Sequence, residues 1–348
     1  MNFRCINFRL SGRSFALMVG LLGVLSLSPI ADSMAGRIIA NAPVPPVTTD
    51  LNSQAPQSPQ VQLANPHLAG AALPLAAVTL KADASVRQGE TFSVTLDMPE
   101  KVDVPQRVEA PQKNAEALYA IYLDKKIPLF QTAVGHYVGW MPVSVFQKVG
   151  QFTLGIRDKQ NRLLASQPVT VADAKFNIQN IKVSKSMGGL QPEPGELDTV
   201  ANLKQIVSWQ KFWDGEFISP TTDCQNSPFG NLRYHNGKPT GDYHKGVDLR
   251  SPLGRPIKAI NGGKVVIARK FRLHGGTVGL DHGYGFTSIY IHMSQINVKP
   301  GQVVKKGDVI GKVGATGFAT GPHLHWGLFV NGLPVNPSQW VHNVPRCG

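Results

Sequence analysis

Five side chains in the last third of the chain have the types and spacings that could build a metal-dependent hydrolytic site. His244 and Asp248 lie four residues apart, His323 and His325 lie two residues apart, and His292 stands in an apolar run. Imidazole and carboxylate groups are common ligands of zinc. A zinc ion with three protein ligands and one open position lowers the pKa of its bound water to about 7, which gives a nucleophile at neutral pH. The set therefore predicts a zinc hydrolase.

The scarcity of glutamate narrows the choice of general base. No Glu follows Glu216, and the HExxH motif, whose Glu is the base of the helical zinc proteases, occurs nowhere in the chain. A histidine titrates near neutral pH and can take the proton instead. We therefore expect three metal ligands and two non-ligand catalytic histidines, and the spacing does not decide whether His323 or His325 binds the metal.

The local sequence predicts strands and loops, rather than a helix, around these residues. Gly246 lies between His244 and Asp248 in a glycine-rich stretch, which disfavours a helix there. Side chains at positions i and i+2 of a strand point to the same face, so His323 and His325 can enter one site. The elements that position the site are thus expected to be β-strands.

The first 35 residues have the features of an export signal. Arg4, Arg9 and Arg13 form a basic start, residues 15–27 are mostly apolar, and 33–35 resemble a small-residue cleavage site. The apolar run is shorter than the roughly 20 residues that span a bilayer. We predict an exported protein of the periplasm or cell envelope, with no stable membrane span after cleavage.

The remaining sequence predicts a mainly β chain in four parts. Residues 36–75 are rich in Pro, Ala, Gln and Asn and are predicted to be a linker. Residues 76–184 contain short alternating runs separated by turn residues, which favours an immunoglobulin-like β-sandwich. Helical spacing of apolar residues predicts a helical connector at 190–213, followed by glycine-rich strands at 214–348.

Charge and cysteines agree with an extracytoplasmic setting. The net charge is +13, and a basic exported protein suits anionic cell-wall polymers or anionic lipid, whereas no nucleic-acid motif is present. Cys5 lies in the predicted signal, which leaves Cys224 and Cys347 as an even pair. Because disulfides persist in oxidising compartments, we predict that these two cysteines form one.

The motifs around the five residues resemble those of the lysostaphin-type (LytM-like) zinc metallopeptidases of bacterial cell walls. The similarity covers roughly residues 220–340. It rests on the segments 229–233 (FGNLR), 244–248 (HKGVD), 262–266 (GGKVV), 278–283 (VGLDHG), 290–292 (YIH), 303–311 (VVKKGDVIG) and 320–325 (TGPHLH), together with Gly317.

The resemblance implies a small antiparallel β-fold with a groove, which serves as a zinc metallopeptidase domain. It also implies that His244, Asp248 and His325 bind zinc and that His292 and His323 are the catalytic histidines. The implied substrate is peptidoglycan. The other histidines of this region are not expected to be ligands; His235 and His274 are expected in surface loops, and His282 is expected to orient a turn.

Two other functions compete with a peptidoglycan endopeptidase. Some relatives of this fold have lost zinc ligands and act as non-enzymatic regulators that activate a cell-wall amidase, but all five positions are filled here. The segment 298–311 resembles a biotinyl- or lipoyl-type carrier hairpin, yet it lacks a convincing lysine at its tip. We therefore expect an endopeptidase.

Overall fold

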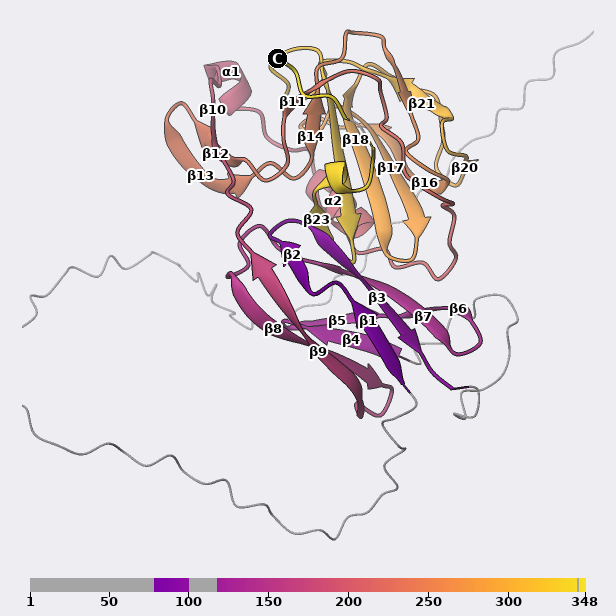
Figure 1. The fold of residues 1–348 in the computed structure, drawn as a ribbon. Coiled ribbons are helices and arrows are strands. Elements are labelled where there is room, and N and C mark those ends of the chain that lie inside the picture. Colours follow the sequence, from indigo (N-terminus) through magenta and orange to yellow (C-terminus); the bar gives the residue numbers. More distant parts are fainter. Residues whose placement is uncertain (1–77, 100–117, 343) are drawn as a thin grey trace, which may run out of the picture. The chain divides into compact units, whose positions relative to one another are not determined.

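The computed structural model describes residues 78–99, 118–342 and 344–348 (Figure 1). The predicted export signal and linker lie outside these residues. Within the described part, strands dominate and helices are few and short, so the predicted mainly β class is confirmed. No helix there is both long and apolar enough to cross a membrane.

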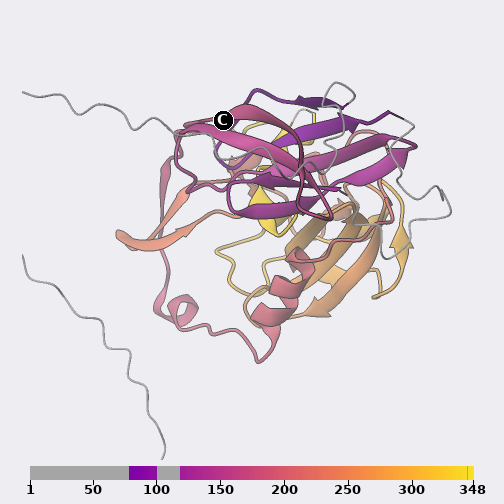
Figure 2. The ribbon, with the colours of Figure 1, turned by 90° about the horizontal axis from the view of Figure 1, so that it is seen from below.

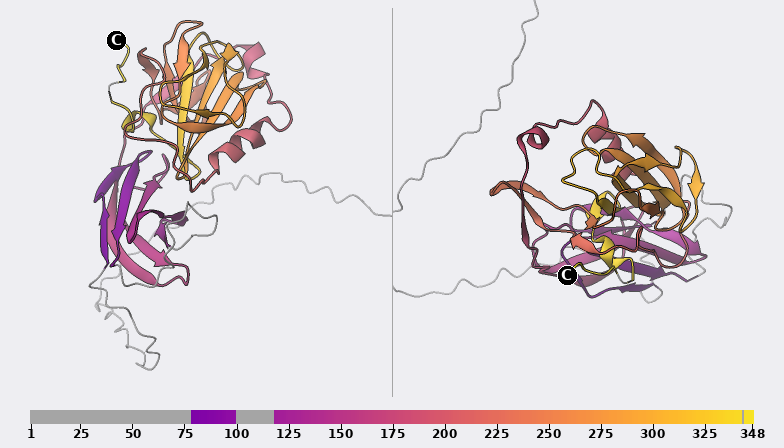
Figure 3. Two further views of the ribbon diagram at one scale, coloured as in Figure 1. Left: turned by 90° about the vertical axis from the view of Figure 1, so that its right-hand side faces the viewer. Right: turned by 90° about the horizontal axis from the view of Figure 1, so that it is seen from above.

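Two sheets enclose the first core. One sheet contains, in spatial order, β1 (Thr79–Ala82), β3 (Thr91–Asp97), β7 (His136–Pro142) and β6 (Phe130–Ala133). The other contains β2 (Ser85–Arg87), β9 (Leu163–Ala172), β8 (Gly150–Asp158), β4 (Leu118–Tyr122) and β5 (Lys125–Pro128). Alternate side chains of both sheets, such as Phe92, Val94 and Leu154, are buried in one cluster. The two layers are visible in Figure 3; their immunoglobulin-like topology stays a prediction.

A larger antiparallel sheet carries most of the residues that could do chemistry. Its spatial order is β11 (Gln225–Ser227), β14 (Val247–Leu249), β22 (Leu324–Val330), β18 (Phe286–Met293), β17 (Gly276–Gly283), β16 (Gly263–Lys270) and β20 (Val303–Val304), with β23 (Leu333–Val335) also paired to β22. Every residue of β17 and β18 is buried, because both faces of these central strands are covered.

Two smaller sheets flank the large one. The first contains β15 (Pro256–Lys258), β21 (Val309–Lys312) and β19 (Gln295–Ile296). The second joins β10 (Ile178–Ile181), β12 (Leu232–His235) and β13 (Lys238–Tyr243), with β10 parallel to β12 (Figure 1). β10 falls inside the range predicted for the β-sandwich, yet its strand partner is β12, far along the chain.

Helix α2 (Glu196–Lys204) covers part of one face of the large sheet (Figure 2). Its residues Val200 and Leu203 are buried with Ile267, Ile289 and Phe329 of the sheet. The observed helix is shorter than the helical connector that was predicted for residues 190–213. Beyond the helix, the backbone bonds across to the turn at 282–284, through Phe212 N to His282 O (2.9 Å) and Tyr284 N to Ser208 O (2.7 Å), and these partners replace those of a helix.

The predicted disulfide between Cys224 and Cys347 is present, with the two Cα atoms 5.0 Å apart. It lies beside an edge of the large sheet, where Gln225 N donates to Pro345 O (2.7 Å) and Cys347 N donates to Gln225 O (3.0 Å). The bond ties the start of this region to the C-terminal segment. A helix of one turn, α1 (Lys185–Gly188), and a 3-10 turn, η2 (Pro337–Gln339), complete the described elements.

Candidate metal centre

The pairing of β14 with β22 places two of the predicted ligands opposite each other. Asp248 is in register with His325, and His325 is also in register with Ile291 of β18, next to His292. His244 precedes β14 and is buried. The strand register therefore brings segments that are 77 residues apart in the sequence into hydrogen-bond distance.

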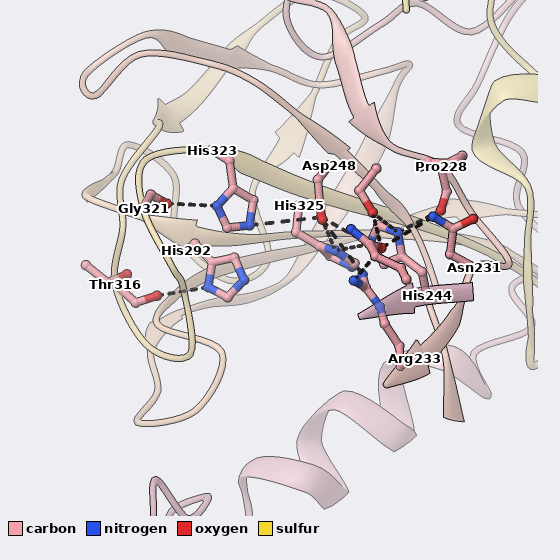
Figure 4. Close-up of polar contacts among 12 residues, drawn as sticks. Pro228, Asn231, Arg233, His244, Asp248, His292, Thr316, Gly321, His323 and His325 are labelled. Carbon is pink, nitrogen blue, oxygen red and sulfur yellow. Dashed lines mark hydrogen bonds and ion pairs between the residues drawn. The ribbon is translucent and has the colours of Figure 1, made fainter. Parts of the chain in front are cut away.

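Three ligand atoms converge at one point (Figure 4). His244 Nε2 lies 3.0 Å from Asp248 Oδ1 and 3.0 Å from His325 Nδ1, and His325 Nδ1 lies 2.9 Å from Asp248 Oδ1. Atoms that share a tetrahedral zinc ion at 2.0–2.1 Å would stand about 3.3 Å apart. Two imidazole nitrogens and one carboxylate oxygen at this spacing fit zinc.

The protonation states of the three residues also fit a metal. His244 Nδ1 lies 2.9 Å from the carbonyl oxygen of Pro228, which can only accept, so Nδ1 carries the proton and Nε2 keeps its lone pair in the neutral ring. Burial lowers the pKa of His325 to about 4, against the opposing effect of Asp248. Burial raises the pKa of Asp248, but the adjacent His244 and His325 outweigh this and hold it well below its usual range.

The other two histidines form a pair beside this centre. The ring centroids of His292 and His323 are 4.8 Å apart, and His323 Nε2 lies 4.0 Å from Asp248 Oδ1. His292 Nδ1 bonds to Thr316 O (2.9 Å) and His323 Nδ1 bonds to Gly321 O (2.8 Å). Since a carbonyl only accepts, each Nδ1 carries a proton, and in the neutral form of each ring the lone pair is at Nε2.

The backbone of His292 adopts an uncommon conformation. Its φ is +64°, in the left-handed region, which costs a non-glycine residue roughly 1–3 kcal/mol. The residue lies at an irregularity near the end of β18, between the pairs Tyr290–Val278 and Met293–Gly276, and its backbone N–H donates to His274 O (3.0 Å). Burial lowers the pKa of its ring to about 3, and the nearby His323 adds to this effect. The strained turn thus holds a neutral imidazole beside the three ligand atoms.

Comparison with known proteins identifies the domain that holds this centre. Residues 242–337 match the model of Peptidase family M23. The chain carries an M23 peptidase domain. The family relationship predicted from the motifs is confirmed by this match.

Curated relatives match about a third of this chain. The peptidoglycan DD-endopeptidase ShyA of Vibrio cholerae is 44% identical over 104 residues, which is 30% of this chain and 24% of the relative. The DD-carboxypeptidase/endopeptidase Mpg of Neisseria meningitidis is 39% identical over 112 residues, 32% of this chain and 26% of the relative. The match thus spans about a quarter of the length of each relative.

A solved structure matches a larger share of the chain. The crystal structure of a candidate M23 peptidase from Pseudomonas aeruginosa has a TM-score of 0.52 and 26% identity, and it covers 73% of this chain and 93% of its own. The likeness therefore extends beyond the M23 domain. This likeness shows a common fold. The roles of single residues have to be argued from the geometry of the site.

The three residues that could hold a metal line a cleft of about 670 Å³. All five predicted site residues lie along it. The cleft is also lined by cationic side chains, which are Lys182, Lys204, Arg233 and Lys245. Lys245 Nζ is paired with Asp242 Oδ2 at 2.7 Å, whereas Lys204 has no ion pair within the part of the chain that the structure describes.

Two histidines that were predicted to lie in surface loops line this cleft. His274 Nδ1 is 2.7 Å from the buried Glu196, and the ring of His235 stacks on Phe318 with centroids 5.9 Å apart. His274 does lie in the loop before β17, as predicted, whereas His235 is the last residue of β12, so the loop prediction is wrong for His235 only. His282 is fully buried, and its ring bonds to Gly262 O (2.6 Å) and Ser288 Oγ (2.8 Å).

Sequence reasoning missed one group beside the ligands. Arg233 Nη2 lies 3.7 Å from Asp248 Oδ2, and Ser227 Oγ lies 3.1 Å from His244 Nδ1. Both Arg233 and Ser227 bond to Gln179 of β10, which the M23 match does not include. No local pattern in the sequence singles out Gln179, since its partners come from β11 and β12.

Proposed function

We propose that this chain is an exported, zinc-dependent endopeptidase that hydrolyses peptide crosslinks of peptidoglycan. The observation that carries the proposal is the convergence of three zinc-type ligand atoms, within 3.0 Å of one another, beside two histidines whose Nδ1 atoms are held by backbone carbonyl oxygens. The M23 relatives named as peptidoglycan DD-endopeptidases support the same substrate class. The cell envelope is the matching location.

In this proposal His244, Asp248 and His325 hold the zinc ion. Zinc, when bound, supplies the Lewis acidity that activates water and polarises the scissile carbonyl. His292 and His323 move the proton. One Nε2 lone pair accepts a proton from the attacking water, and the resulting imidazolium then donates it to the departing amine. The hydrogen bonds from each Nδ1 to Thr316 O and Gly321 O fix the rings so that Nε2 is the reactive atom.

The charges along the cleft support crosslinks that bear free carboxylates. Lys204 is partly buried, and its ammonium lies 5.2 Å from the centroid of the Phe329 ring. Burial lowers the pKa of Lys204, and the neighbouring Lys245 lowers it further. An unpaired, partly desolvated cation suits a carboxylate of a stem peptide. A glycine bridge offers no side-chain carboxylate, so we propose direct crosslinks as the substrate.

Digestion of purified peptidoglycan tests the proposal. The mature protein, loaded with zinc, is incubated with purified sacculi, and the muropeptides are separated and weighed by chromatography and mass spectrometry. Conversion of crosslinked dimers to monomers is expected, and His325→Ala should abolish it together with the metal. Unchanged profiles from a protein that holds one zinc would exclude the endopeptidase and favour the amidase-activating regulator.

A further inference from the structure

The side-chain carbonyl oxygen of Gln179, a residue that lines the cleft, accepts hydrogen bonds from three donors beside the proposed metal ligands. Gln179 Oε1 accepts from Ser227 Oγ (2.8 Å), Asn231 Nδ2 (3.3 Å) and Arg233 Nη1 (2.7 Å). Because the guanidinium can only donate, the amide atom that faces it must be the oxygen. One acceptor therefore fixes three side chains of the stretch 227–233, which lies just before the matched M23 range.

Two of these donors contact metal ligands directly. The Ser227 hydroxyl donates its proton to Gln179, so its oxygen is a second acceptor, at 3.1 Å, for the His244 Nδ1–H group that also faces Pro228 O at 2.9 Å. A proton held at Nδ1 leaves Nε2 of His244 free for a metal. Arg233, held at Nη1 by Gln179, presents Nη2 at 3.7 Å to Asp248 Oδ2.

The third donor supports the same ligand through the backbone. Asn231 is buried, and its carbonyl oxygen accepts from the backbone N–H of His244 at 2.9 Å. Gln179 reaches all three donors because β10 runs parallel to β12 with Gln179 in register with Arg233. The strand register thus aims the Gln179 amide at the metal centre from outside the matched family domain.

We propose that Gln179 is a positioning residue of the metal site: it orients His244 and Asp248 by holding Ser227, Asn231 and Arg233 in place. The inference rests on the proposed metal site and extends it to a strand that precedes the M23 domain. Partners that orient metal ligands typically change metal affinity by about 10–100-fold when they are removed. Gln179 is expected to act on this scale.

Metal affinity of the full mature chain tests the inference without any substrate. Zinc binding is measured by competition with a chromogenic chelator for the wild type, Gln179→Leu and Gln179→Glu. Gln179→Leu keeps the bulk but removes the acceptor, and a loss of affinity of about 10–100-fold is expected. Gln179→Glu restores an acceptor and is expected to recover most of that loss.

A neighbour on the same strand provides the matched control. Asn180 Oδ1 accepts from Gly237 N (2.8 Å) in the turn between β12 and β13, so Asn180→Ala weakens the packing of β10 but spares the three donors. Its zinc affinity should stay within about threefold of the wild type, the scale of an ordinary surface substitution. A loss in Asn180→Ala equal to that in Gln179→Leu would overturn the positioning role.

Kinetics separate positioning from contact with substrate. At saturating zinc, Gln179→Leu should lower kcat on a crosslinked muropeptide and leave KM unchanged. A raised KM with unchanged zinc affinity would overturn the inference, because Gln179 would then contact substrate. If Gln179→Leu does not fold, Gln179→Met is judged by the same criteria. Failure of both to fold, while Asn180→Ala folds, would make the role purely structural.

The outcomes distinguish this inference from the proposed function. Equal zinc affinity of the wild type and Gln179→Leu overturns the positioning role and leaves the endopeptidase standing. A wild type that binds no zinc overturns both. A wild type that binds zinc but cleaves nothing overturns the endopeptidase alone, since the comparison of affinities needs no turnover.

Discussion

Replacing Glu196 by glutamine should destabilise the M23 region in a pH-dependent way. The Glu196 carboxylate is fully buried at the start of α2. It accepts from the backbone N–H groups of Glu193 (2.9 Å), Leu273 (2.9 Å) and His274 (2.7 Å) and bonds to the His274 ring at 2.7 Å. These bonds tie the helix to the segment whose His274 carbonyl receives the backbone N–H of His292.

The magnitude follows from the pKa of this carboxylate. Burial raises the pKa of Glu196, but its hydrogen bonds to His274, Glu193 and Leu273 outweigh this and lower it from 4.5 to about 2. A shift of this size corresponds to about 3 kcal/mol of folding stability above pH 5. Since the folded pKa is the lower one, this stability is present above the unfolded pKa and is lost as pH falls from 4.5 toward 2.

Unfolding in guanidinium chloride, followed by tryptophan fluorescence, measures the effect. Trp209, Trp213, Trp326 and Trp340 report on residues 196–348, and Trp140 packs against Trp213 and Phe286 of the same part. The free energy of unfolding of Glu196→Gln should be about 3 kcal/mol lower than that of the wild type at pH 7. A neutral amide replaces the anion, and its NH₂ group, which can only donate, faces backbone N–H donors. The difference in free energy of unfolding between the wild type and Glu196→Gln should be about 2 kcal/mol smaller at pH 3. At that pH the wild type has lost most of the stability that the low pKa of Glu196 provides.

An exposed carboxylate serves as the control. The Glu216 side chain is 74% exposed and pairs with His342 at 2.9 Å, so Glu216→Gln should change stability by less than about 1 kcal/mol at either pH. A gap between wild type and Glu196→Gln that stays constant from pH 7 to pH 3 would refute the reasoning. The loss would then come from packing, and the low pKa would have no part in it.

Three further predictions concern the metal, the substrate and the disulfide. His325→Ala should lose zinc and activity together, whereas His323→Ala should keep zinc by elemental analysis and lose turnover by roughly 10²–10⁴-fold; the reverse pattern would exchange their roles. Lys204→Met should raise KM for muropeptides with free carboxylates and leave KM for amidated ones unchanged, and an equal effect on both would remove its proposed role. Replacing Cys224 and Cys347 by serine should lower the free energy of unfolding by about 2–5 kcal/mol, because the bond closes a loop of more than 100 residues, and equal stability with and without the bond would contradict this.

The five candidate residues were predictable because each has a local signature. The i, i+2 spacing of His323 and His325 and the glycine between His244 and Asp248 need no knowledge of tertiary structure, although β22 begins only at Leu324, after His323. The structure brings all five to one cleft, and their individual roles stay predictions. The cysteine pair was equally accessible, since an even count in an exported chain leaves one pairing.

The parts that the sequence did not predict depend on contacts between distant segments. Helix α2 ends at Lys204 because the residues after it bond to the turn at 282–284, which no periodicity reveals. His274 is the loop residue that the sequence predicted, but its bond to Glu196 could not be foreseen because the two are 78 positions apart. Local patterns specify the strands, and long-range hydrogen bonds decide where the elements end and which polar groups are buried.

Hydrogen bonds between distant segments also decide how much of the chain is needed to form the proposed metal site. The M23 match starts at residue 242, yet Gln179 bonds to the residues that hold His244 and Asp248, and Glu196 bonds to the segment that holds His292. Buried polar groups that lose their partners destabilise a fold by roughly 1–3 kcal/mol each. A segment cut at the family boundary would leave several such groups without partners. The physical unit that can hold the metal therefore includes β10 and α2, both of which precede the matched domain.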